Sequence, residues 1–123
     1  MRSSELSEII GLEPEISHDV GALRATPDGH LLGGMHAGTY CCYDLGHGED
    51  LPGRDSALVD SIRSWNQYLL VRKADIRRLR ATGGEIEYFI GLFLDRDCGL
   101  ELEPEFLGEL SILGLRMSLD IYP

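Results

Sequence analysis

Two alternating segments around one helix pattern most constrain how this chain can fold. Apolar side chains recur at every second position over residues 85–94, and the same alternation returns over residues 115–122. This period of two is typical of β-strands. Between the segments, Pro104 occupies a first helical position and Gly114 a left-handed stop, which predicts a helix between the two strands.

Helix patterns occur at four places: residues 4–10, about 55–69, 73–81 and 104–113. We expect Ser4 to cap the first helix and Gly11 to end it. The second is expected to begin at Asp55 or Ser56, and Gly83 with Gly84 to end the third. The side chains expected to face inward, at helical spacing, are Leu6, Ile9, Ile10, Leu58, Ile62, Trp65, Leu69, Ile76, Leu79, Phe106, Leu110 and Leu113.

The remaining segments read as loops and short strands. Residues 15–38 are rich in glycine and lack periodicity, which predicts a long loop with at most a short strand near Leu31 and Leu32. Residues 39–45 predict a strand, and residues 100–102 a shorter one. On leaving the helix at 104–113, the chain is expected to present Leu115, Met117, Leu119 and Ile121 on the buried face of the last strand.

This order of elements predicts an α+β fold. We expect a two-layer sandwich, with a mainly antiparallel or mixed sheet of about four strands and three to four helices on one face. At 123 residues, the chain has the length of a single domain, expected over residues 1–123. Its composition of 43% hydrophobic and 26% charged residues is that of an ordinary soluble domain.

The charge is strongly acidic, with 21 acidic and 11 basic residues and a net charge of −10. Such a field disfavours nucleic acid and anionic membranes as partners and favours basic ones, although acidity also serves solubility alone. Without an apolar run of membrane-spanning length or a signal-peptide pattern at the N-terminus, the expected location is the cytoplasm.

One short segment reverses this charge. Residues 72–80 carry five cations and one acid, whereas residues 1–71 and 81–123 each carry a net charge of −7. In a helix, Lys73, Arg77 and Arg80 share one face, and no aromatic side chain alternates with them for base stacking. We therefore interpret the segment as a solvated helix face that pairs with nearby acids, in preference to a nucleic-acid patch.

The sequence carries no signature of catalysis. Phosphate-binding loops and nucleophile elbows are absent, and Cys41, Cys42 and Cys98 read as reduced structural thiols. A zinc site built from His36, one of the paired cysteines and His47 is conceivable but matches no ligand spacing. We expect no catalytic residue, cofactor or metal, and favour a non-enzyme, with an enzyme as the alternative.

A resemblance adds a lead. The segments 99–107 and 119–122 (GLELEPEFL and LDIY), together with Ile9, Ile10, Gly11, Leu12 and Pro14, resemble the bacterial family catalogued as domain of unknown function 4279. The chain lacks the strand with which such proteins begin, and Tyr40 stands where they place a tryptophan. The resemblance carries no catalytic residue. Small bacterial domains of this kind often lie beside toxin genes as immunity proteins, which is an association only.

Two functions follow as hypotheses. The first is a small acidic binding protein, of the immunity type, that masks a basic toxin or enzyme. Its expected contacts are acidic: Glu49, Asp50, Glu85, Glu87, Asp95 and Asp97. The alternative is a small-molecule sensor or weak enzyme with a pocket between sheet and helices, with residues 27–38 as a lid. Its expected lining is Tyr40, Tyr43 and Trp65, with the histidines. A homodimer that covers the edge left by the missing strand is a third reading.

Overall fold

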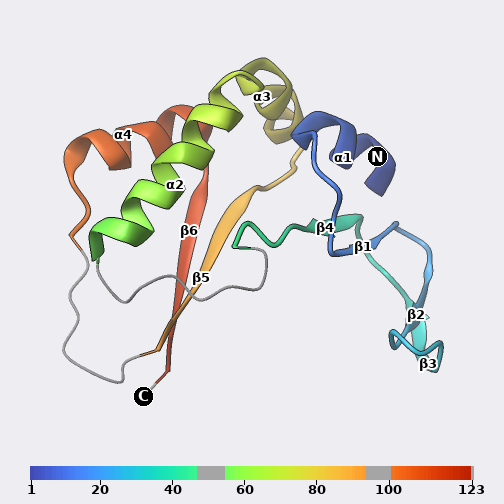
Figure 1. Cartoon of the computed structure of the whole chain (residues 1–123). Helices are drawn as coiled ribbons and strands as arrows, with labels where there is room; N and C mark the ends of the chain where they lie inside the picture. The colour runs from blue at the N-terminus through green and yellow to red at the C-terminus, as the bar shows by residue number, and fades with distance from the viewer. Residues whose placement is uncertain (47–54, 94–100, 123) are drawn as a thin grey trace. The chain divides into compact units, whose positions relative to one another are not determined.

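The computed structural model describes residues 1–46, 55–93 and 101–122 (Figure 1). The chain divides into two compact units, Met1–Glu49 and Asp50–Pro123, and each is described by itself. Four helices and six strands are present in the described residues, so the predicted α+β class is confirmed. The single domain expected over residues 1–123 stays a prediction.

The first unit consists of one helix and two small antiparallel ladders. Helix α1 (Ser3–Ile10) is followed by β1 (Ile16–His18), β2 (Leu23–Ala25), β3 (Leu31–Met35) and β4 (Tyr40–Cys42). Strand β1 pairs with β4, and β2 pairs with β3. The long loop expected over residues 15–38 thus contains three strands. Glycines at positive φ, such as Gly21 and Gly29, make the turns between short pairing segments, and these turns obscure the period of two.

Helix α1 ends as predicted but begins differently. Gly11 adopts the left-handed conformation (φ 78°), and its N–H donates to the carbonyl of Ser7. The expected cap, Ser4, lies inside the helix. Its role is taken by Asp19, which accepts a hydrogen bond of 2.5 Å from the backbone N–H of Ser3. This hydrogen bond lowers the pKa of the Asp19 carboxyl.

The second unit is built from three helices and one parallel strand pair. Its elements are α2 (Asp55–Leu70), α3 (Lys73–Ala81), β5 (Glu87–Phe93), α4 (Pro104–Leu113) and β6 (Arg116–Tyr122). Strands β5 and β6 run parallel, in register from Glu87 opposite Arg116 to Phe93 opposite Tyr122. A parallel pair needs a crossover, and α4 lies between the two strands in the chain (Figure 1).

The core of the second unit lies between its helices and the start of the strand pair. The buried apolar side chains are Ile62, Leu69, Ile76, Leu79, Tyr88, Phe106, Leu110, Leu113 and Leu115. Seven of these were expected to face inward from helical spacing, and that prediction is confirmed. Trp65 is only half-buried and packs edge-on against Tyr68, with ring centroids 5.5 Å apart.

The sheet differs from the expected one. The described strands form three sheets of two strands each, and no sheet of four strands is present among them. Residues 101–103 are not a strand, and β4 is shorter than the expected 39–45. The expected inward face of β6 is buried only at its start, because Leu119 is 39% exposed and Ile121 61% exposed. Alternating apolar residues indicate which face of a strand is buried. They do not indicate how far along the strand that burial extends.

Candidate functional site

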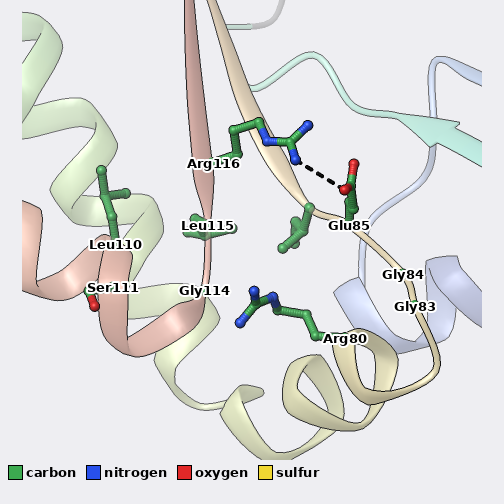
Figure 2. A pocket seen from close by; sticks show the side chains of 10 residues that line it. Arg80, Gly83, Gly84, Glu85, Leu110, Ser111, Gly114, Leu115 and Arg116 are labelled. Atoms are coloured by element: carbon green, nitrogen blue, oxygen red, sulfur yellow. Dashed lines mark hydrogen bonds and ion pairs between the residues drawn. The ribbon is translucent and has the colours of Figure 1, made fainter.

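A cavity lies where the two helix-to-strand turns of the second unit meet (Figure 2). One turn joins α3 to β5 and the other joins α4 to β6. The cavity has a volume of about 620 Å³, within the usual range of ligand sites. Its lining comes from Arg80, Gly83, Gly84, Glu85, Ile86, Leu110, Ser111, Gly114, Leu115 and Arg116.

Local sequence explains why both turns are tight. Gly83 (φ 90°) and Gly114 (φ 68°) adopt left-handed conformations that a side chain would strain. The N–H of Gly84 donates to the carbonyl of Leu79, and the N–H of Leu115 donates to that of Leu110. These bonds satisfy carbonyls that a helix end would otherwise leave unpaired.

A backbone hydrogen bond joins the two turns. The N–H of Arg116 donates to the carbonyl of Ile86 over 3.0 Å, one residue before β5 begins. The parallel ladder therefore starts at the cavity, and its first paired residues hold the cavity wall in place.

The charged side chains of the cavity are two arginines and one glutamate. Nη2 of Arg116 lies 3.0 Å from Oε1 of Glu85, and this pair is exposed. The guanidinium of Arg80 has no hydrogen bond or ion pair to any residue within the described parts of the chain. Its guanidinium lies against Gly114, where an added Cβ would stand 2.6 Å from Cζ. Two arginines against one glutamate leave the lining with one net positive side-chain charge. The lining contains neither histidine nor cysteine to act as a base or thiol nucleophile.

A buried group of hydrogen-bonded polar side chains lies elsewhere in the same unit. Asn66 is fully buried on α2, accepts a hydrogen bond from the phenol of Tyr88 and donates one to Glu109, each over 2.9 Å. Glu109 also accepts two hydrogen bonds from Arg63, which lower the pKa of its carboxyl. Burial, assisted by the nearby Glu109 charge, raises the pKa of Tyr88. No buried side-chain nitrogen or oxygen of the described residues lacks a hydrogen-bond partner. The role of this group of side chains is therefore to connect α2, α4 and β5.

Asn66 is not among the residues expected from the sequence to be functional or buried. A signal was available, because Asn66 follows Ile62 by four residues and precedes Leu69 by three, which places it on the buried face of α2. A polar residue at an inward helical position predicts a buried hydrogen-bond partner.

Two polar clusters occur in the first unit. The imidazole rings of His18 and His36 stack with centroids 3.6 Å apart, and His18 also stacks on Tyr40. Desolvation, followed by the charge of His18, lowers the pKa of His36. Separately, the hydroxyl of Ser7 lies 3.2 Å from that of Tyr43, and burial raises the pKa of the Tyr43 phenol.

None of the expected pocket residues is among those that line the cavity of the second unit. Tyr40 stacks on His18, Tyr43 contacts Ser7, and neither they nor Trp65 lines the cavity of the second unit. The cavity is lined instead by residues from both sides of two turns, which spacing along the chain does not connect.

Of the six acidic contacts expected, two fall on described residues. Glu85 and Glu87 are both exposed, near or on β5, and Glu85 is paired with Arg116. Glu49, Asp50, Asp95 and Asp97 lie outside the described residues.

The basic segment differs from its expected pairing. Within it, Arg78 pairs with Asp75, and Arg72 lies over the ring of Tyr68, 4.5 Å from its centroid. Lys73, Arg77 and Arg80, the shared helix face, have no acidic partner in the described residues. The acidic partners expected for this helix face are therefore not found among the described residues.

Neither a metal-binding cluster nor a membrane-spanning helix is present among the described residues. No three side chains among His, Cys, Asp and Glu are grouped to hold a metal ion, and His47 of the conceivable zinc site lies outside that part of the chain. No helix there has the length and apolarity needed to cross a membrane. Comparison with known proteins likewise gave no match to a family model, a curated protein or a solved structure.

Proposed function

We propose that this chain is a small acidic protein of the bacterial cytoplasm that binds and masks a basic protein, as an immunity protein masks a toxin. The observation that carries the proposal is a set of unpaired carboxylates in the first unit. Residues 1–49 hold eight acidic and two basic side chains. Glu5, Glu8, Glu13 and Glu15 are exposed and have no cationic partner among the described residues.

Unpaired surface carboxylates favour association with cations. Glu5 and Glu8 lie one turn apart on α1, so their charges act on the same side of the helix. Acidic surfaces of this kind raise the association rate of a basic partner and make that rate depend on salt. The proposal also includes a relationship to the family of domain of unknown function 4279. It further includes a sheet of about four strands.

The test is binding of the chain to the product of the adjacent gene, detected by pull-down and followed as an association rate by surface plasmon resonance, at several salt concentrations. We expect a complex at low salt whose association slows as salt rises. The variant Glu5→Gln with Glu8→Gln should slow association further, whereas Glu101→Gln with Glu103→Gln in the second unit is the charge-matched control. No complex at low salt, or binding indifferent to salt, contradicts the proposal.

A second candidate function is a small-molecule sensor. The cavity at the ends of α3 and α4 favours it, because that cavity lies between helices and strands of one unit. A thermal-shift screen with metabolites and metal ions tests this function. If no compound moves the unfolding midpoint, the sensor function is wrong.

A further inference from the structure

Arg80 combines two features: it lines the cavity, and its guanidinium is unpaired among the described residues. Arg63, Arg78 and Arg116 each pair with a carboxylate, whereas Arg80 has no partner among the described residues. Among the described residues, no carboxylate pairs with its guanidinium, although the chain is strongly acidic. Figure 2 shows its side chain reaching into the cavity below Leu115.

The position of Arg80 is set by its contact with Gly114. A Cβ at residue 114 would overlap the guanidinium, so the absence of a side chain there allows the close approach. The end of α4 does not require this arginine. The carbonyls of Leu110 and Ser111 already accept hydrogen bonds from the N–H groups of Leu115 and Gly114. The five donors of the Arg80 guanidinium are thus available to a ligand.

We propose that this cavity binds a small organic monoanion, a carboxylate, through Arg80, with Arg116 as the second cation. A guanidinium presents two parallel N–H groups that match the two oxygens of a carboxylate. The lining carries two arginines and one glutamate, so its net charge of one favours a singly charged anion over a dianion. Glu85 leaves Arg116 with further donors, because the one ion pair between them uses a single nitrogen.

This assignment names the ligand class of the sensor function and is independent of binding to a basic protein. The assignment rests on the sensor function, because both place the ligand in the same cavity. A ligand of another class found in the thermal-shift screen would retain the sensor function while overturning the carboxylate.

The experiment is a titration of the ¹⁵N-labelled full chain with acetate, lactate and benzoate, followed by two-dimensional NMR. Gly83, Gly84 and Gly114 line the cavity, and their backbone amides report directly on its occupancy. We expect saturable shifts of these amides, with succinate and inorganic phosphate binding more weakly than the best monocarboxylate. Absence of saturable shifts, or tighter binding of either dianion, overturns the proposal.

Arg80→Gln should weaken binding of the best monocarboxylate about tenfold, the usual effect of one charge-assisted hydrogen bond. Arg77→Gln is the matched control, because Arg77 is exposed on the same helix, is also unpaired among the described residues and does not line the cavity. The affinity of Arg77→Gln should differ from that of the parent by less than twofold. Arg80→Lys retains the positive charge but lacks the planar guanidinium, so its affinity for the monocarboxylate should lie between those of Arg80→Gln and the parent. Equal affinities for Arg80→Gln and the parent, both folded by their spectra, overturn the role of Arg80.

Discussion

The phenol of Tyr88 donates a hydrogen bond of 2.9 Å to Oδ1 of Asn66, which is fully buried in the second unit. The bond joins β5 to α2, and Glu109 extends it to α4. Buried polar groups are costly without partners, so this short chain of side chains specifies how three elements align.

Tyr88→Phe should lower the free energy of unfolding by about 1–2 kcal/mol, because it leaves the buried Oδ1 of Asn66 without a donor. Asn66→Ala should cost more, about 2–4 kcal/mol, since it removes both hydrogen bonds and leaves a small cavity. Urea unfolding measures both. Gln67→Ala, at the exposed neighbouring position, should change stability little, and an equal loss there would contradict the argument.

Glu109 should make the stability of the second unit depend on acid pH. Hydrogen bonds from Arg63 hold the pKa of the folded Glu109 carboxyl below 4.5, its value in an unfolded chain. Its contribution is therefore complete above that value and is lost as pH falls through the folded pKa. Urea midpoints from pH 7 to pH 3 should fall less steeply for Glu109→Gln than for the parent. Glu101→Gln, exposed and outside the network, should retain the parent profile.

Two glycines, one inside α4 and one just after it, should respond in opposite directions to alanine. Gly114→Ala should destabilise by about 1–2 kcal/mol, because residue 114 has positive φ and its new Cβ would displace Arg80. Gly108→Ala places a Cβ in open space within α4 and should stabilise by about 0.5–1 kcal/mol. Thermal unfolding measures both. A stabilising Gly114→Ala would show that the turn tolerates a side chain.

The histidine pair should make the first unit sensitive to mild acid. His36 has a lowered pKa in the folded chain, mainly through desolvation and then the charges of His18 and Arg24. The unfolded chain binds its proton more readily, so stability is present above about pH 6.5 and declines as pH falls through the folded value. Imidazole proton NMR should show His36 titrating below 6.5, the ordinary pKa of a histidine. His36→Gln should reduce the loss of stability between pH 7 and pH 5.

Local pattern determined the helices of this protein and little of its sheets. Apolar side chains at helical spacing predicted all four helices, and Gly11 and Gly114 predicted two of their ends, because helix hydrogen bonds and stops involve near neighbours in the chain. The cap at Asp19 escaped prediction because it reaches Ser3 from sixteen residues away.

Only the tertiary structure decided the strand pairing and the candidate site. An alternating segment shows a strand without naming its neighbour, so the parallel pairing of β5 with β6 is absent from the pattern. Likewise, the spacing of Arg80 predicted a solvated face. The structure leaves Arg80 exposed, as predicted, but it also brings the guanidinium against Gly114, thirty-four residues further on, at a second helix end. Contacts between distant residues depend on how elements pack, whereas periodicity records only which side of each element is apolar.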